Sequence, residues 1–106
     1  MSREKVHFID SEQQYDIFCT KERYVLYFST EECSVCHAVF PRLEKMLDEY
    51  PLDIGRVDAN SNKKLAGQNL VFNIPTILVF DEGKEVLRES RFIDFDRIQR
   101  LLDLMF

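Results

Sequence analysis

The chain has 106 residues, of which 45% are hydrophobic and 31% charged, and it carries a net charge of −5. These values predict one soluble globular domain over residues 1–106, and the negative charge argues against nucleic acid and anionic membrane surfaces as partners. The N-terminal sequence has no apolar segment typical of a signal peptide, and no apolar run is long enough to span a membrane. We therefore expect a cytoplasmic protein.

The first elements alternate between strand and helix patterns. Residues Lys5–Ile9 show the alternation of a short strand, and Asp10 or Ser11 is a good N-cap for a helix that ends near Thr20. The apolar run Tyr24–Phe28 is rich in aromatic and branched side chains. Such a run predicts a strand that is buried on both faces.

A longer amphipathic helix is predicted from Cys33 to Tyr50, because Pro51 follows. Its apolar positions recur at steps of three and four residues: Val35, Val39, Phe40, Leu43, Met46 and Leu47. Residues Leu52–Asp58 then read as a strand. Asn60 or Ser61 can cap a short helix that continues through Leu70.

The last third of the chain predicts a hairpin followed by a helix. Ile77–Phe80 is a buried strand, and Gly83 supplies the positive φ of the turn that follows it. Glu85–Phe92 alternates as the returning strand, with Val86 expected to point inward. Asp94 is a good N-cap for the final helix.

The resulting order is βαβαβαββα, which belongs to the α/β class. Strands joined through helices must lie parallel, whereas the tight hairpin requires an antiparallel pair. The prediction is a central mixed sheet flanked by helices.

The chemistry-bearing motif is Cys33-Ser34-Val35-Cys36 at the start of the long helix. Two cysteines three positions apart lie about one helical turn from each other, so they can close a disulfide or open to a dithiol. The helix N-terminus favours a thiolate on the first of them. The alternative is a metal site formed with His37, although a structural zinc ion usually has four protein ligands. Cys19 reads as a small buried hydrophobe.

A second motif lies far downstream, where Ile74-Pro75-Thr76 precedes the strand Ile77–Phe80. A strand, a short loop, CxxC, a proline at position 41 and this Ile-Pro-Thr together resemble the thioredoxin family, from about Val6 to the end of the chain. The resemblance implies the thioredoxin fold, with a cis-proline at Pro75 packed against redox cysteines.

The resemblance also implies a thiol–disulfide oxidoreductase that acts on disulfide-containing proteins without a bound cofactor. Cys33 would attack the substrate disulfide and Cys36 would resolve the mixed disulfide. Ser34 and Val35 would tune the couple and contact substrate, and the backbone of Ile74, beside Pro75, would pair with a substrate strand. A thioredoxin reductase-like flavoenzyme would return the pair to the dithiol.

Several positions depart from the family pattern, among them Ser34 and Val35, which stand where thioredoxins usually have Gly-Pro. Glu32 stands where thioredoxins usually have Trp, and Tyr27 stands where they have a buried Asp. The glycine usually found on the substrate-facing surface has no clear counterpart around residues 91–93. These departures keep open a different function, that of a thioredoxin-fold adaptor or binding module with little turnover.

Overall fold

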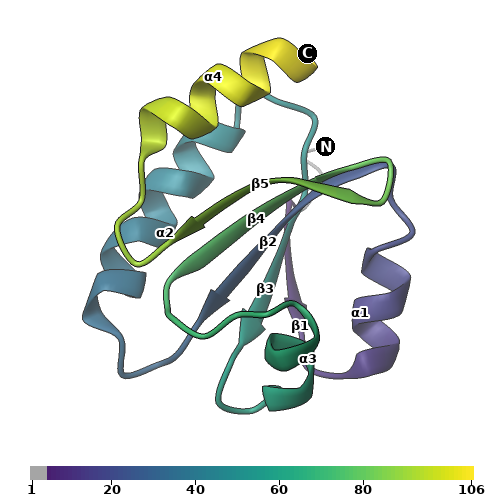
Figure 1. The fold of residues 1–106 in the computed structure, drawn as a ribbon, viewed down its shortest axis with the longest axis vertical. Helices are drawn as coiled ribbons and strands as arrows, with labels where there is room; N and C mark the ends of the chain where they lie inside the picture. Colours follow the sequence, from purple (N-terminus) through teal and green to yellow (C-terminus); the bar gives the residue numbers. More distant parts are fainter. Residues whose placement is uncertain (1–4) are drawn as a thin grey trace.

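The computed structural model describes residues 5–106, so the first four residues of the predicted domain lie outside the described part (Figure 1). The helices and strands follow the predicted order: β1 (Val6–Ile9), α1 (Glu12–Phe18), β2 (Arg23–Ser29), α2 (Ser34–Leu47), β3 (Ile54–Asp58), α3 (Lys63–Gln68), β4 (Thr76–Asp81), β5 (Lys84–Ser90) and α4 (Phe95–Met105). Within this part of the chain, no helix is both long enough and apolar enough to cross a bilayer.

The five strands form one mixed sheet in the order β1-β3-β2-β4-β5. β3 pairs in parallel with both β1 and β2, whereas β4 is antiparallel to β2 and to β5. The predicted parallel and antiparallel halves of the sheet are therefore confirmed. They meet at β2, the central strand that leads into the cysteine motif.

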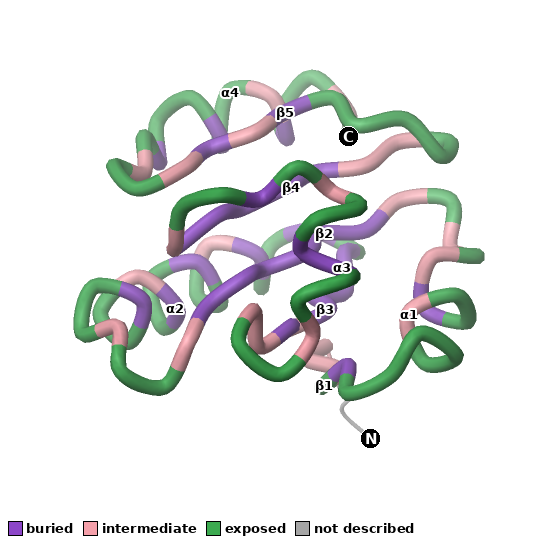
Figure 2. The backbone as a smooth tube through the Cα atoms, turned by 60° about the horizontal axis from the view of Figure 1, so that its bottom comes forward, coloured by how far each residue is buried: buried purple, intermediate pink, exposed green. Residues whose placement is uncertain are grey.

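Helices cover both faces of the sheet, with α2 and α4 on one side and α1 and α3 on the other (Figure 1). β2 is buried from Tyr24 to Ser29, as its apolar run predicts (Figure 2). Its alternate side chains enter two separate cores: Val25 and Tyr27 pack under α2 and α4, while Leu26 and Phe28 pack on the opposite face. The strand before the motif is thus held from both sides.

The end of the sheet differs from the prediction at Val86, which was expected to point inward. Val86 is 42% exposed, and Leu87 is buried instead. The buried positions of the strand are Leu87 and Glu89, so its inward face is the opposite of the predicted one. A shift of one residue in the alternation exchanges the two faces of a strand. A β-bulge lies at the same place: Val79 pairs with Leu87 and Phe80 with Glu85, so Val86 has no partner in β4.

Most other boundaries agree with the prediction to within a few residues. Ser11 and Asp94 are the N-caps of α1 and α4, each accepting a hydrogen bond from a backbone N–H of its helix. The expected caps of α3 are wrong: the N-cap position is Asn62, and the backbone N–H groups of Asn60 and Ser61 donate to the Asp58 carboxylate at 2.8 and 3.0 Å.

Candidate active site

The cysteine motif lies where the loop after β2 enters α2. Cys33 is the N-cap of the helix, and its Sγ accepts a hydrogen bond from the Cys36 N–H at 3.1 Å. Cys33 and Cys36 form a disulfide, with their Cα atoms 5.2 Å apart. Cys36 is completely buried, whereas Cys33 is only partly buried. The Cys33 sulfur is therefore the more accessible of the two to a partner molecule.

Ser34 and Val35, between the cysteines, are both exposed, and Val35 is 52% accessible. Ser34 is the first residue of the helix, and its hydroxyl has no hydrogen bond with the described residues, whereas Cys33 is the N-cap. Both side chains lie on the surface beside the disulfide.

His37 holds the loop before Cys33 against the helix. Its Nε2–H donates to the Glu31 carbonyl at 2.7 Å. No group of three or more His, Cys, Asp or Glu side chains within residues 5–106 is arranged to hold a metal ion. The imidazole thus orients the loop, and the Cys33, Cys36 and His37 set is not assembled as ligands.

Tyr27 lies beneath the motif and is completely buried. Its hydroxyl donates to the Cys36 carbonyl at 2.6 Å, and its ring packs against Phe40, with the ring centroids 5.1 Å apart. Burial raises the pKa of Tyr27 to about 12, against the opposing effect of the nearby Arg56 guanidinium. At neutral pH the group beneath Cys36 is therefore a neutral hydrogen-bond donor.

The Ile74–Pro75 peptide bond is cis, as the resemblance implies. Ile74 and Cys33 both pack at the margin of the core that contains Cys36. Thr76 holds the turn, since its hydroxyl donates to the Asn73 carbonyl at 2.5 Å. The backbone N–H and carbonyl of Ile74 make no hydrogen bond within residues 5–106. The loop thus presents free backbone groups at the margin of the core that contains Cys36.

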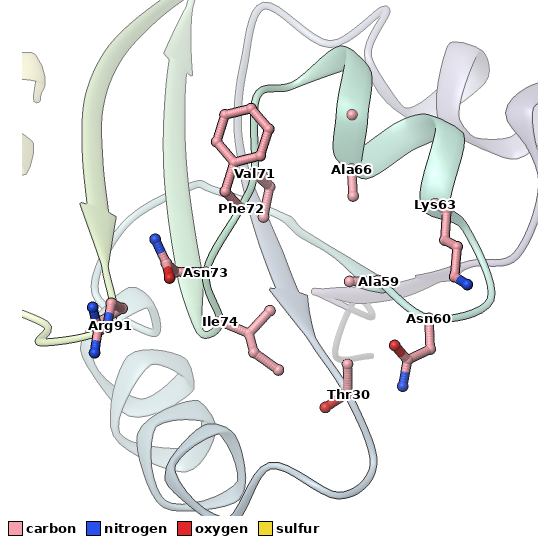
Figure 3. A pocket seen from close by; sticks show the side chains of 11 residues that line it. Thr30, Ala59, Asn60, Lys63, Ala66, Val71, Phe72, Asn73, Ile74 and Arg91 are labelled. Carbon is pink, nitrogen blue, oxygen red and sulfur yellow. The ribbon is translucent and has the colours of Figure 1, made fainter.

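A groove of about 700 Å³ runs along this loop, between α3 and the end of β5 (Figure 3). Its lining residues come from α3 and from the loops around it, from the loop after β2 and from the residue after β5: Thr30, Ala59, Asn60, Lys63, Ala66, Gly67, Val71, Phe72, Asn73, Ile74 and Arg91. Of these, only Ile74 was expected to contact substrate. Arg91 lies in residues 91–93, where the family glycine has no clear counterpart in the sequence. Its positive φ of 66°, a conformation that favours glycine, identifies Arg91 as the residue at the glycine position.

Cys19 lies apart from the redox pair. It packs against the core on the other face of the sheet, with Phe18 and Tyr24 among the members of that core. Burial raises the pKa of the Cys19 thiol. Cys19 is only partly buried, so it packs against the core as expected of a small hydrophobe but is not buried in it as predicted.

The sequence matches the family model for thioredoxin over residues 5–103. The chain belongs to the thioredoxin family. Its relatives include a thioredoxin-like protein, YdfQ, of Bacillus subtilis, 38% identical over 82 residues that make up 76% of this chain and 73% of that protein. Thioredoxin of Chlamydia pneumoniae is 30% identical over 96 residues, 90% of this chain and 94% of its own length.

Solved thioredoxin structures confirm the fold. Thioredoxin O2 of Arabidopsis thaliana in its oxidised state superposes with a TM-score of 0.85 at 19% identity, covering 99% of this chain and 97% of its own. Thioredoxin of Trypanosoma brucei brucei also gives 0.85, at 22% identity, covering 98% and 95%. Membership of this family, together with the redox-active cysteine pair, makes the chain a thiol–disulfide oxidoreductase.

Proposed function

We propose that this protein reduces disulfides in protein substrates, with Cys33 as the attacking thiol and Cys36 as the resolving thiol. The difference in burial supports this assignment, because a substrate can approach partly exposed Cys33 but not completely buried Cys36. The capping position supports it as well: the Cys36 N–H already donates to Cys33 Sγ, and a thiolate accepts such a bond more strongly.

The reaction balances as two successive exchanges. The Cys33 thiolate attacks one sulfur of the substrate disulfide, forming a mixed disulfide and releasing the other sulfur as a thiolate that takes up a proton. The Cys36 thiolate then attacks Cys33 Sγ, which releases the second substrate thiol and closes the Cys33–Cys36 disulfide. The substrate gains two electrons and two protons, and the protein loses both. A thioredoxin reductase-like flavoenzyme then restores the dithiol.

The cis-proline loop would hold the substrate during this exchange. The unpaired backbone of Ile74 favours an extended substrate segment that adds to the loop in the manner of a β-strand. Pro75, which is buried, would fix that loop, while the exposed Ser34 and Val35 would contact the segment from the helix side. We further propose that residues 1–106 act as one domain in the cytoplasm.

A second candidate is an adaptor that docks partners through this surface with little turnover. Two replacements favour the adaptor: Tyr27 stands where thioredoxins have a buried Asp, and Glu32 stands where they usually have Trp. Neither side chain has the chemistry of the residue that it replaces. Tyr27 donates to a backbone carbonyl and is not an anion that accepts a proton from Cys36.

Reduction of insulin by the dithiol protein distinguishes the two functions. We expect turnover with wild type and none with Cys33→Ser, while Cys36→Ser should accumulate a mixed disulfide on Cys33. Cys19→Ser is the matched control and should retain activity. Binding of substrates without turnover in wild type would favour the adaptor, and a mixed disulfide on Cys36 would overturn the assigned roles.

A further inference from the structure

Arg91 occupies an unusual backbone conformation at the margin of the groove that runs along the cis-proline loop. It follows β5 directly, with a φ of 66° in the left-handed region that non-glycine residues seldom adopt. Its N–H donates to the Pro75 carbonyl at 2.9 Å, which ties the end of β5 to the cis-proline loop. A strained residue held in this way at a binding surface is a reason to look for a role of its side chain.

The guanidinium of Arg91 is exposed and has no anionic partner. Its contact with the described residues is with the Phe92 ring, 5.7 Å from the ring centroid, and no carboxylate of residues 5–106 lies within 4.0 Å of it. The nearest carboxylates along the chain are engaged elsewhere: Glu89 pairs with Arg97, and Asp94 caps α4. The positive charge at this margin is therefore available to a ligand.

Charge is distributed unevenly around the groove. The lining residues include two cations, Arg91 and Lys63, and no acidic residue, although the whole chain carries a net charge of −5. Arg91 and Lys63 lie on opposite sides of Ile74 (Figure 3). Neither cation has a carboxylate of residues 5–106 within 4.0 Å. Of the two, Arg91 is the one whose backbone is bonded to the cis-proline loop, so it is the cation that a segment paired with Ile74 would meet first.

We propose that Arg91 is a specificity-determining residue that selects substrates carrying Asp or Glu within two residues of the attacked cysteine. This inference rests on the proposed reduction of protein disulfides. A segment paired with Ile74 passes beside Arg91, because the Arg91 N–H is bonded to the residue that follows Ile74. A guanidinium binds a carboxylate through two parallel hydrogen bonds, which gives geometric selectivity as well as charge attraction. Exposed Phe72 and Phe92, 80% and 86% accessible, offer apolar surface for the rest of the segment.

The test uses three disulfide-linked peptides that differ only at the positions flanking the cysteine, with Asp, Ser or Lys there. The measured quantity is the ratio of kcat/KM values between peptides within each variant, so that a loss of folded protein cancels. For wild type we expect the Asp peptide to exceed the Lys peptide by about five-fold at low ionic strength, the size typical of one exposed ion pair, and by less at high salt.

Arg91→Gly should remove most of this preference and Arg91→Glu should reverse it. Lys84→Glu is the matched control, since Lys84 is an exposed cation at the opposite end of β5 and its change makes the same difference in net charge. The control should keep the wild-type ratio.

The outcomes separate this inference from the proposed function. If the Ser peptide is reduced but wild type shows no preference for Asp, or if Arg91→Glu and Lys84→Glu change the ratio equally, the role of Arg91 is overturned and the reductase function stands. If wild type reduces none of the three peptides, the proposed function itself fails.

Discussion

Replacing Tyr27 by Phe tests the hydrogen bond beneath the active site. The substitution keeps the ring that packs on Phe40 and removes only the hydroxyl, which donates to the Cys36 carbonyl at 2.6 Å in a completely buried position. Loss of one buried hydrogen bond should lower the free energy of unfolding by about 1 kcal/mol at pH 8.

The effect should depend on pH with a defined sign. Burial raises the pKa of Tyr27 from 10.0 to about 12, so the folded state holds this proton more tightly than the unfolded chain does. The stability linked to the proton is fully present below pH 10 and is lost as pH rises from 10 to 12. Linkage gives a loss of about 1.4 kcal/mol by about pH 11 in wild type, and the Phe variant lacks this loss.

The two proteins should therefore differ by about 1 kcal/mol at pH 8 and become nearly equal near pH 11. The assay is urea unfolding of the oxidised proteins across this pH range, with Cys19→Ala in both so that no free thiol attacks the disulfide. The other tyrosines are the same in wild type and in the Phe variant, so their titration cancels in the difference between the two free energies of unfolding. A difference that stays constant up to pH 11 would refute the linkage, and equal stability at pH 8 would refute the contribution of the hydrogen bond.

Three further predictions concern packing and charge. Gly55→Ala should destabilise the protein by about 1–3 kcal/mol, because an added Cβ would lie 2.7–3.0 Å from core side chains. Gly67→Ala should stabilise α3 by up to about 1 kcal/mol, because an added Cβ there has no atom within 4 Å. Urea unfolding measures both changes. Leu87→Ala should lower the free energy of unfolding by about 2–4 kcal/mol and Val86→Ala by less than about 0.5 kcal/mol, because Leu87 is buried and Val86 is exposed. Equal losses would contradict this difference in burial. Glu32→Gln should speed alkylation of the Cys33 thiol at neutral pH, and the gain should shrink at high salt, because a neighbouring carboxylate opposes thiolate formation. An unchanged alkylation rate at low salt would contradict this effect of Glu32.

Local patterns in the sequence determined the elements and their order. The uninterrupted apolar run at Tyr24–Phe28 required two-sided burial, and a strand buried on both faces must lie in the middle of a sheet. The short turn around Gly83 required an antiparallel hairpin, and the remaining crossovers required parallel strands. The position of CxxC at a strand-to-helix junction placed the redox pair. Each of these inferences uses residues that are close together in the chain.

Only the tertiary structure decided how distant segments meet at the site. The β5 bulge, the reach of the Tyr27 hydroxyl to Cys36 and the left-handed Arg91 beside Pro75 depend on contacts between separate elements. A pattern of hydrophobic spacing shows which face of an element is buried but not which polar group lies opposite it. The groove therefore could not be predicted from the sequence, because its lining residues come together only when β5, α3 and the cis-proline loop pack beside β2.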